Sequence, residues 1–163
     1  MCRYHTEAAV WQSLNIVLKD FAFASVSVSG SKCNLPNMSR VLIMDDEADT
    51  RILLEEILKS AGHEVILAAD GLEGMQQCHS TPVDLALVDL FMPRQEGLET
   101  IRKLKQQFPD FPIIAMSGDA LALPLLSVAQ RLGATEVLQK PFLPEELLEA
   151  IKHVLQPKAA DER

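Results

Sequence analysis

Five polar side chains in this sequence follow short hydrophobic runs, and their types are those that phosphoryl chemistry uses. Carboxylates can act as nucleophiles that form acyl phosphates. A lysine and a hydroxyl can hold the oxygens of a phosphoryl group in transfer. If the runs are strands of one parallel sheet, these groups meet at its carboxyl edge, where open α/β sheets bind ligands. The five residues are Asp45, Asp46, Asp89, Ser117 and Lys140.

Crowded carboxylates predict a metal ion at the same edge. Three acids in one small cleft raise at least one pKa unless a cation neutralises them. Mg²⁺ takes oxygen ligands, keeps several waters and needs only one or two carboxylates together with phosphate oxygens. Asp45, Asp46 and Asp89 are therefore candidate magnesium ligands. Asp46 has a second interpretation, because an aspartate just before Glu47-Ala48 can cap a helix.

The elements that must position these groups alternate between two periodicities. From Arg40 onward, short apolar runs alternate with longer amphipathic segments, which is typical of a βαβ series. The runs predict strands near 40–45, 64–68, 84–88, 112–116 and 136–139. The amphipathic segments predict a helix at 48–61, closed by Gly62, and further helices near 71–79, 97–107, 122–132 and 144–155.

Continuous Val/Ile/Leu runs indicate strands that are buried on both faces. Helices must then cover both sides of a parallel sheet, and right-handed crossovers give a doubly wound arrangement. The expected fold class is α/β, with a doubly wound five-stranded parallel sheet and helices on both faces.

Length, charge and cysteine usage limit the function classes. The 163 residues suffice for one domain with a core. A net charge of -8 argues against a nucleic-acid-binding surface, which is normally basic, and no uninterrupted apolar run is long enough to span a bilayer. Cys2, Cys33 and Cys78 lack metal-ligand spacing, so we expect free thiols in a reducing compartment, the cytoplasm.

The first 37 residues differ in character from the rest. The alternation over 21–29 is compatible with a strand followed by a linker at 30–36, whereas a signal peptide is disfavoured by a weak apolar core and by Glu7. Met38 can instead be the functional start, in which case the extension is disordered or lies upstream of it. We therefore expect an extension at 1–37, a domain at 38–157 and a tail at 158–163.

The combination of these motifs resembles the receiver domain of two-component response regulators. The resemblance covers about residues 39–156, and the set of motifs is specific although each one alone is weak. It implies a flavodoxin-like sheet with strand order 2-1-3-4-5. The matching segments are Asp45-Asp46, Asp89-Leu-Phe-Met-Pro93 with Gly97 beyond it, Ser117-Gly118 and Lys140-Pro141-Phe142.

The resemblance implies a role for each site residue. Asp89 would be the phosphoacceptor, Ser117 the switch hydroxyl and Lys140 the lysine that contacts the phosphoryl oxygen. A cis peptide bond between Lys140 and Pro141 follows from the same resemblance. The implied ligands of Mg²⁺ are the carboxylates of Asp45, Asp46 and Asp89 and the backbone carbonyl of Phe91.

Two features qualify the resemblance. Many receivers have Tyr or Phe three residues before the lysine, where this chain has Val137, so an aromatic rotamer switch is not available there. Phe91 and Asp119 occupy positions that tune dephosphorylation in the family, and they do not by themselves set a lifetime for the phosphoryl group.

The expected function is that of a stand-alone response regulator. A sensor histidine kinase, a phosphotransfer protein or a small phosphodonor would phosphorylate Asp89 with Mg²⁺ bound. The modified protein would then bind a downstream protein target through its fourth helix, fifth strand and fifth helix. We expect no nucleic-acid or membrane partner for this chain, and no enzyme activity beyond self-phosphorylation and self-dephosphorylation.

Two other classes remain as alternatives. A magnesium-dependent phosphatase acting through an aspartyl phosphate would need a general acid, typically an aspartate two residues after the nucleophile, where this chain has Phe91. A pseudo-receiver that binds partners without phosphorylation would not need the acidic and basic residues that are all present. The chain could also be a phosphorelay shuttle, a regulator of a partner or a fragment of a longer protein.

Overall fold

The computed structural model describes residues 38–92, 97–118 and 123–156. The expected extension at 1–37, the tail at 158–163 and Asp119 lie outside these described residues. The domain boundaries therefore remain predictions.

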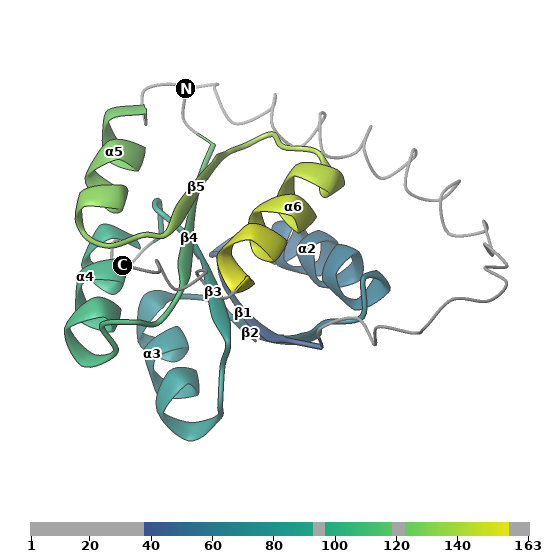
Figure 1. Ribbon diagram of the computed structural model, residues 1–163, viewed down its shortest axis with the longest axis horizontal. Helices are drawn as coiled ribbons and strands as arrows, with labels where there is room; N and C mark the ends of the chain where they lie inside the picture. Colours follow the sequence, from purple (N-terminus) through teal and green to yellow (C-terminus); the bar gives the residue numbers. More distant parts are fainter. Residues whose placement is uncertain (1–37, 93–96, 119–122, 157–163) are drawn as a thin grey trace, which may run out of the picture. The chain divides into compact units, whose positions relative to one another are not determined.

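Five parallel strands form one sheet in the order β2-β1-β3-β4-β5, as the resemblance implied (Figure 1). Each expected strand is present with its ends within one residue of the prediction. The strands β3 and β4 each run one residue further than expected, because Asp89 is still in register with Met116 and Ser117 with Gln139. The strands are β1 Arg40–Met44, β2 Glu64–Ala68, β3 Leu85–Asp89, β4 Ile113–Ser117 and β5 Glu136–Gln139.

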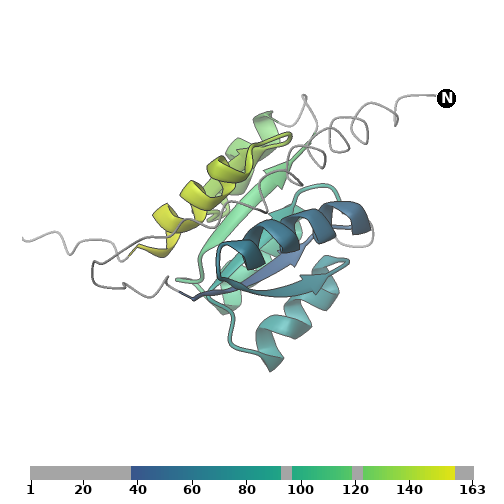
Figure 2. The same ribbon diagram turned by 90° about the vertical axis from the view of Figure 1, so that its right-hand side faces the viewer.

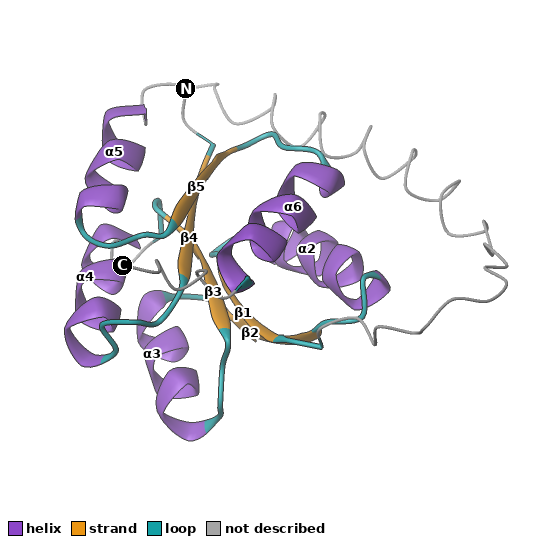
Figure 3. Ribbon diagram, viewed as in Figure 1, coloured by secondary structure: helices purple, strands orange, loops and turns teal. Residues whose placement is uncertain are grey.

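Five described helices cover both faces of the sheet, which confirms the doubly wound fold. The helices α2 and α6 lie on one face, and α3, α4 and α5 lie on the other (Figures 1 and 3). The view turned by 90° looks onto the side of the sheet that α2 and α6 cover (Figure 2). The helices are α2 Ala48–Ser60, α3 Gly71–Ser80, α4 Gly97–Gln107, α5 Leu123–Arg131 and α6 Pro144–Leu155.

Local sequence signals mark one end of α2 and one end of α3. Gly62 adopts a φ of 90° just after α2, a conformation that glycine adopts readily. The carboxylate of Asp70 accepts the amides of Leu72 and Glu73 and so caps α3. The residue before α2 is Glu47, without a side-chain capping bond, so the structure does not support the alternative role of Asp46 as a helix cap.

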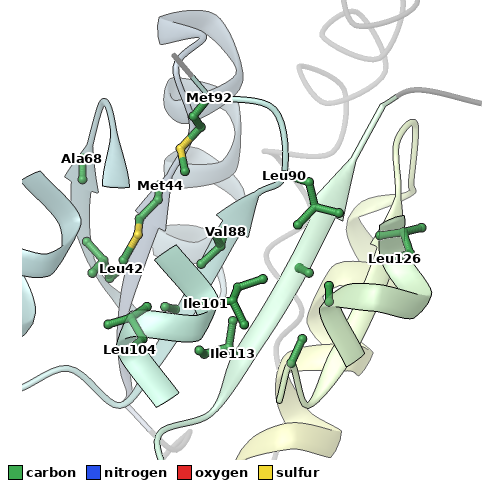
Figure 4. Packing of buried hydrophobic residues seen from close by; sticks show 14 residues of the cluster. Leu42, Met44, Ala68, Val88, Leu90, Met92, Ile101, Leu104, Ile113 and Leu126 are labelled. Atoms are coloured by element: carbon green, nitrogen blue, oxygen red, sulfur yellow. The ribbon is translucent and has the colours of Figure 1, made fainter. Parts of the chain in front are cut away.

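The core lies on both faces of the sheet because the strand side chains alternate between them. On the face covered by α3, α4 and α5, Leu42 and Val88 are buried together with Ile101 and Leu104 of α4 (Figure 4). The helices α2 and α6 bury leucines and isoleucines of their own on the other face. Burial on both sides is the physical reason that the strands read as unbroken apolar runs.

The described residues contain a single cysteine and no helix suited to a membrane. Cys78 is a free thiol, as expected, and burial raises its pKa to about 11. Cys2 and Cys33 lie outside the described residues. Within the described ranges, none of the helices combines the length and apolar character needed to cross a bilayer.

Gly97 allows α4 to begin directly against the end of β3. Its amide donates to the carbonyl of Leu90 at 3.2 Å. A Cβ atom at Gly97 would overlap the carbonyl of Asp89 and come within 2.6 Å of the Leu90 Cα atom. These neighbours are backbone atoms, which cannot rotate away. The glycine therefore serves close packing at the strand end that carries Asp89.

We expect Gly97→Ala to lower the free energy of unfolding by about 1–3 kcal/mol, because the added methyl group forces α4 away from β3. Urea denaturation would measure the change. Gln106→Ala, at an exposed position of the same helix, is the matched control and should change stability little. Equal stability of the Gly97→Ala variant and the native protein would contradict the assigned packing role.

Candidate functional site

Four of the residues identified from sequence come together at the carboxyl edge of the sheet. Asp45 follows β1, Asp89 and Ser117 end β3 and β4, and Lys140 follows β5. Backbone bonds continue the ladders past the strand ends: the Leu90 amide donates to the Met116 carbonyl at 2.9 Å, and the Lys140 amide to the Ser117 carbonyl at 2.8 Å. The topology thus places two acids, a hydroxyl and an amine on neighbouring strands.

The ammonium group of Lys140 lies between two carboxylates. Its Nζ atom donates to Asp45 Oδ2 at 2.7 Å and also to Asp89 Oδ2. All three side chains are buried, with exposed fractions of 8% for Lys140, 0% for Asp45 and 9% for Asp89. The peptide bond from Lys140 to Pro141 is cis, as the resemblance implied.

Backbone amides fix the second oxygen of each buried acid. The amide of Glu47 donates to Asp45 Oδ1 at 2.9 Å, and the amide of Phe91 donates to Asp89 Oδ1 at 2.8 Å. Both carboxylates are therefore held at two points, one on the lysine and one on the main chain that follows the acid. Their orientation is set before any ligand binds.

One lysine neutralises two acids, and the pKa values reflect that imbalance. Burial raises the pKa of Asp89 from 3.8 to about 6, and the charge of Asp45 contributes to the rise while Lys140 opposes it. Burial alone would lower the pKa of Lys140, but the charges of Asp89 and Asp45 outweigh it and raise that pKa. The cleft thus has an excess of negative charge that a further cation would relieve.

Asp46 differs from the buried pair. Its side chain is exposed, whereas Asp45 beside it is buried. Burial nevertheless raises the pKa of Asp46, and the charges of Asp45 and Glu47 raise it further. Asp46 therefore lies within electrostatic reach of the buried acids but at the solvent side of the site.

Ser117 contributes a hydroxyl without a partner. Its side chain is fully buried, and Oγ makes no hydrogen bond within the described part of the chain. A buried hydroxyl without a partner costs free energy, so native proteins rarely keep one without a reason. A phosphoryl oxygen arriving beside Asp89 would supply the missing acceptor.

We expect Ser117→Ala to raise the free energy of unfolding of the unmodified protein by about 1 kcal/mol, because the change removes a buried hydroxyl that lacks a partner. Urea denaturation in the presence of a chelator would measure the gain. Ser60→Ala serves as the control, since the Ser60 hydroxyl is exposed and donates to the carbonyl of Glu56 at 2.7 Å. A loss of stability in Ser117→Ala would show that the hydroxyl already has a partner.

The donor chemistry of the cleft fits a hard divalent cation. The available groups are carboxylate and carbonyl oxygens, the ligands that Mg²⁺ prefers, and the excess negative charge favours such an ion. Within the described ranges, however, no three acidic, histidine or cysteine side chains are already grouped to hold a metal ion. The magnesium ligands therefore stay a prediction: Asp45, Asp46, Asp89 and the backbone carbonyl of Phe91.

Arg51 is a site neighbour that the sequence interpretation missed. It is the fourth residue of α2, and its Nη1 atom donates to the backbone carbonyl of Asp45 at 2.6 Å. The signal in the sequence was weak, because an arginine in the first turns of a helix is usually solvated. Only the position of α2 against the end of β1 reveals the contact.

Comparison with known proteins gives a consistent result. A family model described as the response regulator receiver domain matches residues 41–152. The alkaline phosphatase synthesis transcriptional regulatory protein PhoP of Bacillus subtilis is 31% identical over 117 residues, which cover 72% of this chain and 48% of that protein. The regulatory protein VirG of Rhizobium rhizogenes is 37% identical over 121 residues, covering 74% and 50%. The chain thus spans about half the length of these curated relatives.

Solved structures with the same fold include isolated domains. A CheY-like response regulator receiver domain protein from Methanospirillum hungatei superposes with a TM-score of 0.69 and 33% identity, covering 72% of this chain and 94% of that one. The response regulator protein TrrA from Thermotoga maritima, solved in complex with Mg²⁺-BeF, has a TM-score of 0.67 and 32% identity, covering 72% and 100%.

Proposed function

The chain belongs to the response regulator receiver domain family, and on that premise we propose that Asp89 accepts a phosphoryl group from a histidine kinase or a phosphotransfer protein. The observation that carries the proposal is the buried Asp89 carboxylate, which shares the ammonium group of Lys140 with Asp45. Signalling then proceeds through phosphorylation-dependent binding of a protein target.

The transfer is a displacement at phosphorus. An oxygen of Asp89 forms a bond to the phosphorus atom while the bond from phosphorus to the donor imidazole nitrogen breaks, and the imidazole leaves with the electron pair. The Phe91 amide holds Asp89 Oδ1 and so restricts rotation of the carboxylate. Because little covalent chemistry is required of the protein in such transfers, positioning and charge stabilisation do most of the work.

The product brings new charge to groups that are already in place. Lys140 can exchange its contact with the Asp89 carboxylate for one with a phosphoryl oxygen while it still faces Asp45. The hydroxyl of Ser117, buried and without a partner among the described residues, gains an acceptor. These two changes connect the modification to the ends of β4 and β5.

Mg²⁺, held by Asp45, Asp46, Asp89 and the Phe91 carbonyl, would neutralise the phosphoryl oxygens during transfer. The excess negative charge around Asp89 supports its binding. The structure of TrrA from Thermotoga maritima, solved in complex with Mg²⁺-BeF, supports the proposal that a protein with this fold binds Mg²⁺.

A surface next to the site would change on phosphorylation and bind the protein target. We assign this role to α5, β5 and α6, since Lys140 directly follows β5 and precedes α6. Val137 replaces an aromatic residue in β5, so coupling would rely on the main-chain bond between Lys140 and Ser117 rather than on a rotamer change. We place the protein in the cytoplasm.

Turnover of external substrates is the less favoured function. A phosphatase working through an aspartyl phosphate needs a proton donor near the nucleophile. The position two residues after Asp89 carries Phe91, whose apolar side chain is 48% exposed. This residue therefore cannot supply the proton that turnover would need.

Intact-mass spectrometry after incubation with acetyl phosphate tests the proposal. We expect a single phosphoryl adduct on the native chain in Mg²⁺ and none when a chelator replaces the metal. A phosphorylated histidine kinase core can serve as a second donor. Absence of an adduct with every donor would overturn the phosphorylation mechanism and favour a constitutive binding module.

A further inference from the structure

We call the segment Asp45-Asp46-Glu47, between β1 and α2, the acidic turn. The guanidinium group of Arg51 contacts the main chain of this turn rather than its carboxylates. Its Nη1 atom donates to the Asp45 carbonyl at 2.6 Å, while the Asp45 amide donates to the Ala68 carbonyl at 3.2 Å. Both backbone polar groups of Asp45 therefore have partners. The carboxylate of Asp45 is bound by Lys140 and by the Glu47 amide instead.

The carbonyl that Arg51 holds controls the direction of the next residue. It belongs to the planar peptide unit that joins Asp45 to Asp46. Fixing this oxygen therefore fixes the plane of the unit and the direction in which the chain enters Asp46. Because the Asp46 side chain is exposed, its placement depends on the backbone more than on packing.

The turn is fastened to α2 at a second point. The hydroxyl of Thr50, a buried residue, donates to the Glu47 carboxylate at 3.0 Å. Glu47 in turn donates its amide to Asp45 Oδ1 at 2.9 Å. The first turn of α2 thus holds the acidic turn on both sides of Asp46.

We propose that Arg51 is a positioning residue: its contact with the Asp45 carbonyl fixes the 45–46 peptide unit and holds the Asp46 carboxylate where Mg²⁺ can bind. The inference rests on the proposed function, because it takes the magnesium site as given. Arg51 leaves the carboxylate of Asp45 to Lys140 and Glu47, so its contact positions the acids without occupying their oxygens.

A role of Arg51 through its charge and a role through positioning predict opposite changes in Mg²⁺ affinity when the residue is substituted. Removing a positive charge near a cation site strengthens cation binding through Coulomb's law. Removing a group that orients the ligands weakens it, typically by about tenfold or more. Arg51→Met keeps the apolar stem and deletes both the charge and the donor, so the direction of the change separates the two roles.

The test is titration calorimetry of the full chain with Mg²⁺. We expect the dissociation constant of Arg51→Met to rise about tenfold and Arg51→Lys, which keeps the charge and a donor, to recover part of the loss. Phosphorylation by acetyl phosphate should need more Mg²⁺ for half-maximal rate and keep its rate at saturating Mg²⁺. Hydrogen exchange at the Glu47 amide should quicken.

A matched control lies on the same helix. Lys59 is exposed and pairs with Glu55 at 2.6 Å, so Lys59→Met removes a positive charge from α2 without touching the turn. An unchanged or lower dissociation constant in folded Arg51→Met would overturn the inference, as would an equal rise in Lys59→Met. If Arg51→Met does not fold, Arg51→Leu, which also removes both the charge and the donor, decides by the same criterion.

The outcome for the native chain separates this inference from the proposed function. Native protein that binds Mg²⁺ and accepts the phosphoryl group, with Arg51→Met binding Mg²⁺ equally well, overturns the role of Arg51 alone. Native protein that neither binds Mg²⁺ nor accepts a phosphoryl group overturns both.

Discussion

Asp89→Asn protein is expected to accept no phosphoryl group from acetyl phosphate in Mg²⁺, whereas the native chain accepts one. The amide keeps the size of the side chain and can still accept the Phe91 amide, which donates to Asp89 Oδ1 at 2.8 Å in the native protein. It lacks the anionic oxygen that must attack phosphorus. Intact-mass spectrometry after equal incubation of both proteins measures the difference.

Asp110→Asn provides the control for this experiment, because Asp110 is an exposed aspartate away from the carboxyl edge of the sheet. It should be phosphorylated to the native extent. An adduct of native size on Asp89→Asn would instead assign the acceptor role to another acid of the cleft.

Lys140→Met is expected to lower the free energy of unfolding by about 3 kcal/mol at pH 7 in the presence of a chelator. The substitution leaves Asp45 and Asp89 buried side by side without a counter-ion, and breaking a buried ion pair on one side is costly. Urea denaturation measures the loss. Adding Asp89→Asn to Lys140→Met should restore part of it, because one of the two uncompensated charges is removed.

The direction in which folding stability changes with pH follows from the raised pKa of Asp89. Its pKa is raised from 3.8 in the unfolded chain to about 6 in the folded protein, so the folded state binds this proton more tightly. The contribution to stability is complete below pH 3.8 and is lost as pH rises through about 6. Without the attraction of Lys140 the pKa of Asp89 rises further, so the carboxyl is protonated up to a higher pH. The loss of unfolding free energy in Lys140→Met should therefore shrink when the pH is lowered from 7 to 5.

Lys152→Met is the control for the charge change, since Lys152 is exposed on α6. It should leave the unfolding free energy and its pH profile close to those of the native protein. A Lys140→Met variant as stable as the native chain at pH 7 would contradict the placement of the ammonium group between the two acids.

Most of the fold could be predicted because its signals are local. Apolar runs buried on both faces marked the strands, and Gly62 and Pro144 marked where α2 ends and where α6 begins. The strand ends that carry Asp89 and Ser117 were placed one residue short. Their extension depends on pairing with neighbouring strands, which no single segment encodes.

The site could be predicted in its residue types but not in its contacts. The sequence presented Asp45 and Asp46 as an equivalent pair, yet only Asp45 is buried against Lys140. Both residues lie beyond the end of β1, where the tertiary fold decides the course of the chain and therefore which of the two side chains is buried. Arg51 was missed because its contact joins a helix to the end of a strand and follows from tertiary packing alone.

The ion pairs of Lys140 also bear on how the chain folds. They join residues that are 95 and 51 positions apart, across β1, β3 and β5. Closing such long loops costs chain entropy before any contact repays it, and topologies of this kind fold slowly. A growing chain that has not yet formed β5 has the acids but not their counter-ion. If Asp89 accepts a phosphoryl group as proposed, it can do so with Lys140 beside it only after β5 has joined the sheet.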